Sequence, residues 1–327
     1  MRMKRIACAT ALLALAALMA VGAGAEDKYP TRTVKFLVPL HLGTPPAVAM
    51  RVIAEKLQTM WGQPVVLESR LGASQNIAAD ALARAEPDGY TLLFTPPAPL
   101  VTAKWIYKKL SFDPDAFTPV SAPFGYSMVL TIGPNVPVKT FAEFIAYAKA
   151  NPRKLTNVHP GVTSVPYLAM QALQRRAGID MVQVAYQNMA QGQLDQIAGR
   201  VDVILDPFVA RAIEQHLAGK LKILATAGNA REPRLPDVPT ISEVLPGYEM
   251  VEWYAIMAPP NTPPAIAEKV SRDIAEALRT PDVAERLVLL GYNARVGGTP
   301  ADLTKLIREG NDRWRELIAS LGMTKSM

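Results

Sequence analysis

The sequence has almost no cysteine, and this excludes two large classes of protein. Among its 327 residues there is one cysteine, Cys8, and there are three histidines. A disulfide scaffold and a cysteine-rich zinc site each need several cysteines, so neither is possible here. A chain of this length must be stabilised by apolar burial instead, and half of its residues are hydrophobic.

The catalytic motifs that have a recognisable spacing are missing as well. The sequence contains no Gly-x-Ser-x-Gly, no His-Glu-x-x-His and no phosphate loop ending in Gly-Lys-Ser/Thr. His41, His159 and His216 lie far apart, unlike metal ligands on one helix. Ser164, His41 and Asp206 form a Ser-His-Asp set only on paper, because long chains contain such sets by chance. We expect a protein that is not an enzyme and needs no cofactor or metal, with a secreted hydrolase as the less favoured alternative.

Positive charge is in excess, but it forms no basic stripe. Lys and Arg number 35 against 29 acidic residues, a net charge of +6. Three of these positive charges, Arg2, Lys4 and Arg5, belong to the N-terminal segment, and the others are interspersed with acidic residues. A nucleic-acid-binding protein gathers its basic residues on one face, so we expect no nucleic-acid partner.

The first 25 residues have the three parts of a secretory signal peptide. A positive start precedes the apolar run 6–21, and Ala23-Gly24-Ala25 supplies a small-x-small cleavage site. An uncleaved membrane anchor is the alternative, but the weakly apolar Gly and Ala end suits cleavage better. We predict cleavage before Glu26, export to the periplasm, and a mature chain that has no cysteine and a net charge of +3.

Strand-like and helix-like segments alternate along the mature chain. Helix starts are marked by Pro45-Pro46, by Thr140 with Glu143, and by Thr299-Pro300 with Asp302. This alternation predicts an α/β fold with largely parallel sheets that are covered on both faces. Short apolar runs predict strands at 34–40, 65–67, 90–94, 128–132, 181–184, 201–205 and 221–226.

No long linker divides the mature chain, which argues against two domains joined by a single tether. We expect two α/β lobes connected by more than one crossing, with the crossings near 129–132 and 251–258. Lobe 1 is predicted to comprise residues 26–130 and 252–327, and lobe 2 residues 131–251. A cleft between such lobes is a natural ligand site.

The candidate site follows from where the predicted strands end. Ligands bind beyond the carboxyl ends of parallel strands, and a helix N-terminus there presents free N–H groups to an anion. Lys and Arg are absent from these turns, so backbone amides and hydroxyls would hold the anion. The candidate ligand-binding residues are His41, Leu42, Gly43, Thr44, Thr95, His159, Gly161, Thr163, Ser164, Tyr186 and Asp206.

Each candidate also has a purely structural interpretation. Thr44 and Asp206 are equally suited to cap a following helix. The Tyr186 ring suits core or hinge packing as well as ligand contact. For His41 and His159, the sequence favours turn residues whose hydrogen bonds are satisfied locally over a functional role.

Motifs spread from Tyr29 to the C-terminus resemble those of one family. The most specific of them is Pro87-Asp88-Gly89-Tyr90-Thr91-Leu92. The others are Tyr29-Pro30, Val38-Pro39, Arg51, Glu68-x-Arg70-x-Gly72-Ala73, Asn76-Ile77-Ala78, Phe117-Thr118-Pro119-Val120, Tyr186 with Asp195, Gly199-x-Val201-Asp202, Leu235-Pro236-Asp237-Val238-Pro239-Thr240, Pro246-Gly247-Tyr248-Glu249 and Trp253. On these motifs the chain resembles the Bug family, the periplasmic substrate-binding proteins of tripartite tricarboxylate transporters.

The resemblance implies a type II periplasmic-binding-protein fold, in which two α/β lobes close on a ligand. That ligand is usually a carboxylate, held through backbone amides and waters of the first-strand turn and the facing-lobe turn. The implied function is that of a monomeric solute-binding protein that presents a small carboxylate to membrane permease subunits. The alternative is a ligand-sensing subunit that presents the carboxylate to a membrane sensor kinase.

The sequence departs from the family pattern at the turns themselves. Pro45 and Pro46 lack N–H groups, which removes two donors from the first turn. Larger side chains also replace family glycines, as at 185–189. We therefore expect a carboxylate with an apolar or aromatic body, with His41 and His159 supplying donors when they are protonated.

Overall fold

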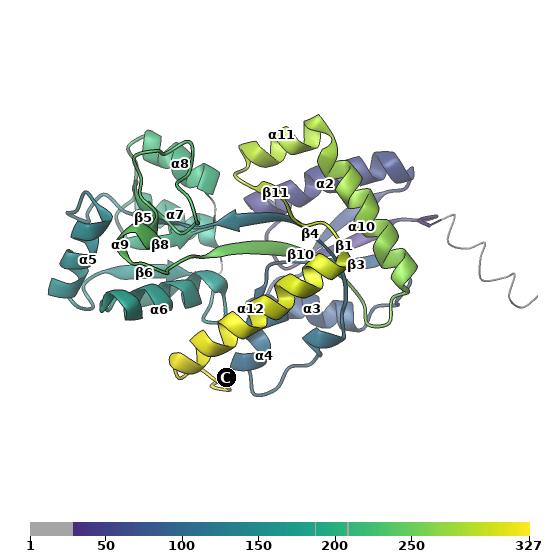
Figure 1. The fold of residues 1–327 in the computed structure, drawn as a ribbon, viewed down its shortest axis with the longest axis horizontal. Helices are drawn as coiled ribbons and strands as arrows, with labels where there is room; N and C mark the ends of the chain where they lie inside the picture. Colours follow the sequence, from purple (N-terminus) through teal and green to yellow (C-terminus); the bar gives the residue numbers. More distant parts are fainter. Residues whose placement is uncertain (1–28, 187, 208) are drawn as a thin grey trace, which may run out of the picture.

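The polypeptide folds into two α/β lobes that lie side by side in this computed structural model (Figure 1). The structure describes residues 29–186, 188–207 and 209–327, without the side chains of Asp206, Val209 and residues 293–297. The signal peptide predicted over residues 1–25 lies outside the described residues. Within the described part of the chain, no helix has the length and apolar character needed to cross a membrane.

The first lobe is built on a six-stranded sheet. Its strands are β1 (Val34–Val38), β2 (Val65–Ser69), β3 (Thr91–Thr95), β4 (Thr118–Ser127), β10 (Val251–Ala258) and β11 (Asn293–Gly297), in the order β11-β4-β10-β3-β1-β2. Strand β1 is parallel to β2 and β3. Strand β10 is antiparallel to β3 and β4, and β11 is antiparallel to β4.

The second lobe is built on a five-stranded sheet. Its strands are β5 (Val129–Ile132), β6 (Thr156–His159), β7 (Val182–Ala185), β8 (Val203–Asp206) and β9 (Lys222–Thr226), in the order β7-β6-β8-β5-β9. Strand β6 is parallel to β7 and β8, whereas β5 is antiparallel to β8 and β9. The chain enters this sheet directly from β4 and leaves it before β10.

Helices cover the two sheets. The first lobe carries α2 (Pro45–Trp61), α3 (Asn76–Ala83), α4 (Ala103–Ile106), α10 (Pro264–Arg279), α11 (Pro281–Leu289) and α12 (Pro300–Ser320), with the short turns η2 (Ala73–Gln75), η3 (Ala98–Thr102) and η4 (Pro114–Ala116). The second lobe carries α5 (Phe141–Ala150), α6 (Val165–Ala177), α7 (Met189–Ile197), α8 (Val209–Leu217) and α9 (Ile241–Val244).

Local sequence explains where α2 begins and ends. Prolines occupy its first turn, where their missing N–H groups leave no intrahelical bond unmade. The helix ends at Gly62, whose φ of 62° is the left-handed conformation that glycine adopts without a Cβ clash. Met50, Ile53 and Leu57 recur at helical spacing and are fully buried, so this face packs α2 on the sheet.

One apolar core runs through both lobes and the strands that join them. The rings of Phe94 and Tyr254 stack with their centroids 5.1 Å apart, and Phe124 packs against both. Burying each side chain of this kind contributes roughly 1.5–3 kcal/mol. Aromatic packing therefore holds β3, β4 and β10 together, and β4 and β10 are the strands through which the chain leaves for the second lobe and returns from it.

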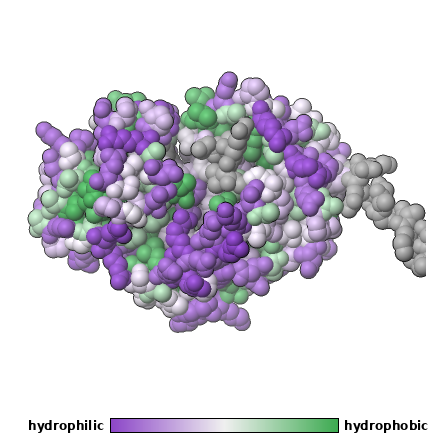
Figure 2. Space-filling model, in the orientation of Figure 1, coloured by the Kyte–Doolittle hydropathy of each residue, from purple (hydrophilic) through white to green (hydrophobic). Residues whose placement is uncertain are grey.

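Helix α12 spans the two lobes along one face of the molecule (Figure 1). Thr299 and Asp302 form the capping box that the sequence predicts at its start, and Trp314 is fully buried. At its end, the Arg175 guanidinium of α6 donates to the Ser320 carbonyl. The outer face of α12 is covered by hydrophilic side chains of both signs (Figure 2).

The predicted alternation of strands and helices is confirmed, and so is the capping box of Thr140 and Glu143 on α5. Both sheets are mixed, however, where the sequence favours largely parallel ones. The reason is topological: the chain crosses to the second lobe through β4 and β5 and returns through β10, so the outgoing and returning strands run in opposite directions. Apolar runs do not encode that direction.

Candidate functional site

The carboxyl ends of the parallel strands in each sheet lie at the edge nearest the other lobe. Val129, which opens β5 just after the crossing from β4, pairs with Asp206 at the end of β8. Thr95 ends β3 and pairs with Ala255 on β10. Strand β10 is the segment by which the chain returns from the second lobe to the first. The turns after β1, β3, β6, β7 and β8 therefore gather at the junction of the lobes, where the sequence places the site.

The first turn, between β1 and α2, is open. His41 and Gly43 are exposed, and Leu42 and Thr44 are half-buried. The Thr44 hydroxyl donates to the His41 carbonyl (2.7 Å) and caps no helical amide. The Arg51 guanidinium, from the second turn of α2, donates to the Leu42 carbonyl over a long distance of 3.5 Å. This turn therefore keeps much of its polar surface unused.

The second turn, between β6 and α6, is closed by its own hydrogen bonds. The Gly161 amide donates to His159 Nδ1 (3.1 Å), and the Ser164 hydroxyl donates to the Gly161 carbonyl (2.6 Å). The Ser164 oxygen also accepts from the Tyr167 amide and so caps α6. Thr163 and Ser164 are buried. The shape of this turn is thus fixed by hydrogen bonds among its own residues.

His159 is a structural member of the second turn. Its side chain is 2% exposed and packs against the Tyr167 ring, with centroids 4.6 Å apart. Burial lowers the pKa of His159 below its ordinary value, and Nδ1 accepts a hydrogen bond, so that atom carries no proton. This arrangement opposes the protonated donor that the sequence suggests for His159.

Both turns present backbone amides that have no partner. Among the described residues, the N–H groups of Leu42 and Gly43 donate to no protein acceptor, and the same holds for those of Val162 and Thr163. Each pair stands just before a helix, α2 or α6, whose N-terminus carries a partial positive charge. Such amides suit a carboxylate oxygen.

Two contacts join the second turn to the first lobe. The Thr102 hydroxyl of η3 donates to the Thr163 carbonyl (2.8 Å), with the Ala98 carbonyl as a second acceptor at 3.1 Å. A Cβ placed on Gly161, whose φ is 142°, would lie 3.1 Å from Ser74 Oγ. The second turn thus rests against η2 and η3 of the first lobe.

The remaining predicted residues have separate positions. Thr95 is fully buried, and its hydroxyl donates to the adjacent Pro96 carbonyl (3.0 Å). The Tyr186 hydroxyl donates to Asp195 (2.7 Å), a carboxylate whose pKa is lowered to about 2 by Tyr186 and Arg200. Tyr186 can therefore offer its ring to a ligand while its hydroxyl is engaged. The backbone of Asp206 ends β8, and its side chain lies outside the described residues.

Sequence reasoning misses the η2 segment and Thr102. Ala73, Ser74 and Gln75 all have positive φ, a conformation that no local sequence signal announces for alanine or glutamine. Ser69 lies two residues beyond the strand predicted at 65–67; in the structure it ends β2, and its hydroxyl donates to the Leu40 carbonyl just before the first turn (2.9 Å). No periodic pattern predicts the bond of Thr102 to a residue 61 positions away.

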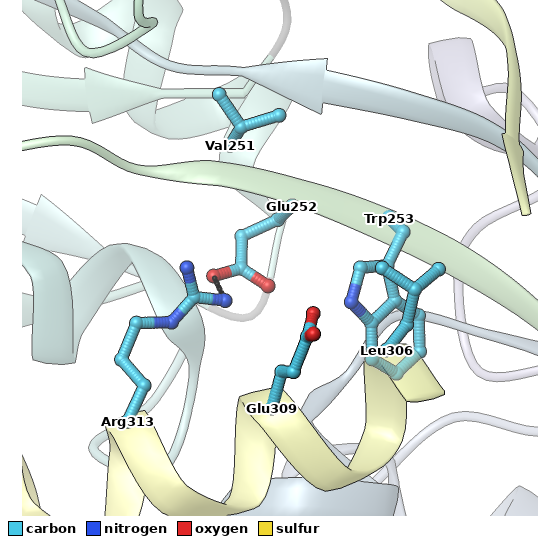
Figure 3. Close-up of a pocket in the computed structure, with 6 residues that line it drawn as sticks. All are labelled: Val251, Glu252, Trp253, Leu306, Glu309 and Arg313. Atoms are coloured by element: carbon cyan, nitrogen blue, oxygen red, sulfur yellow. Dashed lines mark ion pairs between the residues drawn. The ribbon is translucent and has the colours of Figure 1, made fainter. Parts of the chain in front are cut away.

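A separate pocket of about 200 Å³ lies between β10 and α12 (Figure 3). Glu252 is 1% exposed there, and burial raises its pKa to about 7, against the opposing effect of Arg313. Arg313 Nη2 approaches Glu252 Oε1 to 3.1 Å as an ion pair without hydrogen-bond alignment. The pocket contains none of the predicted site residues; its lining residues are Val251, Glu252, Trp253, Leu306, Glu309 and Arg313.

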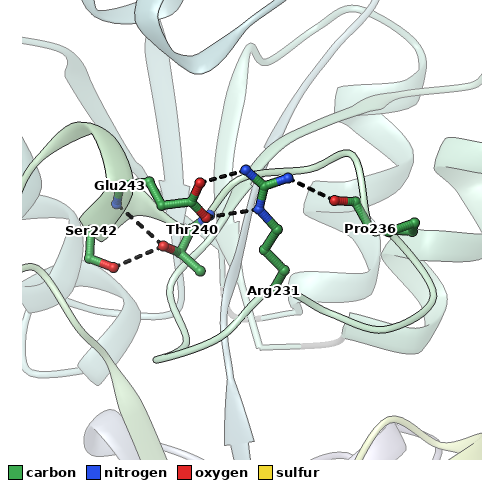
Figure 4. A network of polar contacts seen from close by, with 5 residues as sticks. All are labelled: Arg231, Pro236, Thr240, Ser242 and Glu243. Carbon is green, nitrogen blue, oxygen red and sulfur yellow. Dashed lines mark hydrogen bonds and ion pairs between the residues drawn. The ribbon is translucent and has the colours of Figure 1, made fainter.

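A polar network fixes the loop after β9 (Figure 4). The Arg231 guanidinium binds the Glu243 carboxylate and the Pro236 carbonyl (2.8 Å). Arg231 and the Thr240 amide lower the pKa of Glu243 to about 2. Thr240 in turn bridges to Thr226 at the end of β9. The network is structural and positions a strand end near the lobe junction.

Within the described part of the chain, no three His, Cys, Asp or Glu side chains gather in a way that could hold a metal ion. The chemistry gathered at the lobe junction is that of backbone amides, hydroxyls and side-chain amides. Such a set can bind and orient an anion or a polar solute.

Comparison with known proteins agrees with a binding role. The model of the tripartite tricarboxylate transporter family receptor (TctC) matches residues 49–323. Protein BugT of Bordetella pertussis is 30% identical over 321 residues, covering 96% of this chain and 98% of its own. These matches extend over nearly the whole chain.

Solved structures with the same architecture carry bound carboxylates. Rpa4515 of R. palustris with adipate superposes with a TM-score of 0.85 at 29% identity, covering 90% of this chain and 99% of its own. MatC of Rhodopseudomonas palustris with bound malate gives a TM-score of 0.82 at 31% identity, covering 89% and 100%. The chain belongs to the tripartite tricarboxylate transporter family receptors, the TctC or Bug periplasmic binding proteins, which are solute receptors and not enzymes.

Proposed function

We propose that this protein binds a small carboxylate at the junction of its lobes and presents it to a tripartite tricarboxylate-type transporter. The ligand carboxylate would accept hydrogen bonds from the free amides of Leu42 and Gly43 in one lobe and of Val162 and Thr163 in the other. Binding to both lobes would favour the closed arrangement, which the membrane partner can recognise.

The observation that carries this proposal is the pair of free amides before each of α2 and α6. Orphan amides beside a helix N-terminus attract a carboxylate without a cationic side chain. The structures that bind adipate and malate, at 29% and 31% identity, support a carboxylate as the class of ligand.

The proposal also covers the export of the protein, its oligomeric state and its membrane partner. We propose export to the periplasm through the signal peptide at residues 1–25, and a monomer with lobes of 26–130 plus 252–327 and of 131–251. The partner would be a set of permease subunits. Presentation to a sensor kinase is the alternative, and crosslinking of the ligand-loaded protein in native membranes would separate the two.

The apolar or aromatic ligand body expected from the sequence stays a prediction. Leu42 is partly buried against the main core, and Met189 and Tyr186 each pack against a small buried cluster in the second lobe. Part of the apolar surface of these side chains is therefore buried within the protein and does not face a ligand. Binding of benzoate and adipate in a ligand panel would test whether the remaining apolar surface contacts the ligand.

The proposal is tested by titrating the purified mature protein with succinate, malate, glutarate, adipate, citrate and benzoate. A bound ligand at 100 times its Kd stabilises the fold by about 2.7 kcal/mol, which thermal unfolding measures, and calorimetry then gives the Kd. We expect stabilisation by at least one dicarboxylate. Flat titrations across the whole panel would contradict the proposal.

A further inference from the structure

Glu252 is a buried acid whose charge no hydrogen bond stabilises. It is 1% exposed, and among the described residues neither of its carboxylate oxygens accepts a hydrogen bond. Arg313 approaches it to 3.1 Å as an ion-pair partner, but the Arg313 side chain is 42% exposed, so water weakens the attraction. An ionised carboxylate is costly where water is excluded and no donor replaces it. Burial therefore favours the neutral, protonated form of Glu252 in this arrangement of the lobes.

Glu252 is the second residue of β10, where the chain returns from the second lobe. Met250, two residues earlier, is still held by the second lobe, because its amide donates to the Ala227 carbonyl just beyond β9 (2.7 Å). Val251 already pairs with Ser127, the last residue of β4. Glu252 thus follows directly on the return crossing, and a change in the angle between the lobes bends the chain there.

Helix α12, which faces Glu252, is fixed to the first lobe at both ends. It begins shortly after β11, a strand of the first-lobe sheet. Beyond its last turn, the Lys325 amide donates to the Trp105 carbonyl of α4 (2.8 Å). The contact of Arg175 with the Ser320 carbonyl joins the end of the helix to the second lobe, so it depends on how the lobes are arranged. A rotation of the second lobe that bends β10 therefore moves Glu252 relative to α12.

Three titratable groups of the described residues face Glu252 from the elements packed against it. Figure 3 shows Arg313 and Glu309 pointing from α12 toward the Glu252 carboxylate. Tyr126 lies opposite on β4, and burial raises its pKa well above the ordinary value, so it stays neutral near pH 7. Glu309 is exposed and lies 3.9 Å from the Lys305 ammonium. Glu252 is the buried member of this set that ionises near neutral pH, because burial raises its pKa to about 7 while Arg313 opposes that rise.

We propose that Glu252 is a proton-binding site at the hinge that links the arrangement of the lobes to pH. In the arrangement described here, with Thr102 bonded to Thr163 across the lobes, the carboxyl is buried and holds the proton. When the lobes open and β10 bends, water reaches the carboxylate, which releases the proton. Acid therefore favours the lobes in contact, and a higher pH favours their opening. The inference goes beyond the proposed function, since it holds with or without a bound carboxylate.

Energy transfer between two dyes measures the lobe arrangement without a ligand. The predicted mature chain has no cysteine, so Glu214→Cys on α8 and Glu285→Cys on α11 place one dye on each lobe at an exposed position. A Cβ on Gly291, just beyond α11, would lie 2.9 Å from the Ala210 amide nitrogen of α8, so these helices meet where the lobes join.

In the labelled mature protein, the ratio of contacting to open lobes should rise as the pH falls. Between pH 8 and pH 6 we expect a rise of about tenfold, for a pKa of about 7 with the lobes in contact and the ordinary value of 4.5 when they are open. Dyes whose emission does not change between these pH values give the ratio directly.

Three variants in the labelled protein identify the group that responds. Glu252→Gln keeps the shape of the side chain and its neutral state, so the lobes should stay in contact at both pH values, with a change of less than about twofold. Glu309→Gln is the matched control, because it removes an exposed acid from the same pocket, and it should keep the full response. Arg313→Gln should move the midpoint to a higher pH, since Arg313 lowers the pKa of Glu252.

The outcomes are distinct. A wild-type ratio that does not change between pH 8 and pH 6, or a response that survives in Glu252→Gln, would overturn the inference. So would an equal loss of the response in Glu309→Gln, or a midpoint that stays or falls in Arg313→Gln. None of these measurements uses a carboxylate, so a ligand panel without binding would contradict the proposed function alone.

Discussion

The two turns at the lobe junction differ in how much of their hydrogen bonding is already used. The first turn, residues 41–44, is largely exposed, and its Thr44 side chain caps no amide. In the second turn, residues 159–164, the polar groups of His159, Gly161 and Ser164 bind one another. Both turns nevertheless keep two free amides.

The difference suggests a division of roles. A turn that is buried and internally bonded keeps its amides in place before the ligand arrives, which reduces the ordering that binding requires. An exposed turn can adjust to the ligand on binding. We therefore expect the second turn to be the fixed half of the proposed site and the first turn the adaptable half, so that substitutions affect the two turns unequally.

The largest difference is expected between two glycines. Gly161→Ala forces a Cβ against Ser74 at a φ of 142°, and we expect it to destabilise the fold by about 1–3 kcal/mol and to weaken malate binding. At Gly43 no atom lies within 4 Å of the added Cβ, so Gly43→Ala should change stability by about 0.5 kcal/mol or less. Urea unfolding measures both values, and equal losses would contradict the comparison.

A second difference is expected between the two helix caps. Ser164 accepts from the Tyr167 amide, so Ser164→Ala should cost about 1 kcal/mol. Thr44 makes no such bond, and Thr44→Ala should cost about 0.5 kcal/mol or less. The two free energies of unfolding come from the same urea titrations. A cost at Thr44 equal to that at Ser164 would show that the first turn is also prebuilt.

The bond between the lobes should have a similar, slightly smaller effect. Thr102→Val keeps the shape of the side chain and removes the hydrogen bond to the Thr163 carbonyl, and we expect a loss of about 0.5–1.5 kcal/mol. Hydrogen exchange at the Ser164 and Tyr167 amides should become faster in this variant. Unchanged exchange would mean that η3 does not hold the second turn.

The smallest effect concerns pH. Burial lowers the pKa of His159 in the folded state, so the unfolded chain takes up a proton first as the pH falls. The contribution is fully present above the unfolded pKa of about 6.5 and is lost as the pH falls through the folded value. His159→Gln should therefore flatten the decrease in stability below pH 6.5, and the exposed His41→Gln serves as the matched control.

Glu252 complicates that measurement because its effect has the opposite sign. Its folded pKa of about 7 lies above the unfolded value, so its contribution to stability is lost as the pH rises toward 7. The His159 profile is therefore best measured in a Glu252→Gln background. An equally steep decrease below pH 6.5 with and without His159 would contradict the buried neutral imidazole.

Much of the fold could be predicted from the sequence. Apolar runs predict β5 and β9, and Thr with an acidic residue three positions on predicts the starts of α5 and α12. The rule that ligands bind beyond strand ends also directs attention to both turns. These signals are local, because periodicity and capping depend on residues within one or two turns of the chain.

Less of the site could be predicted. The sequence offers His159 as a protonated donor, whereas burial and the Gly161 amide favour its neutral form. The sequence correctly places Tyr186 at a strand end, but its hydroxyl donates a hydrogen bond to the Asp195 carboxylate. Whether a polar atom is free or engaged depends on neighbours that come from elsewhere in the chain.

By itself, the sequence determined the alternating elements, the turns that follow the strands, and the absence of catalytic motifs, because each of these depends on residues that are close together in the chain. Only the tertiary structure decided that the crossing strands run antiparallel, that Thr102 binds Thr163, and that Ala73, Ser74 and Gln75 adopt positive φ. These features arise because contacts between segments distant in the sequence stabilise them by more than the local backbone preference opposes them. That stabilisation cannot be estimated from any one segment alone.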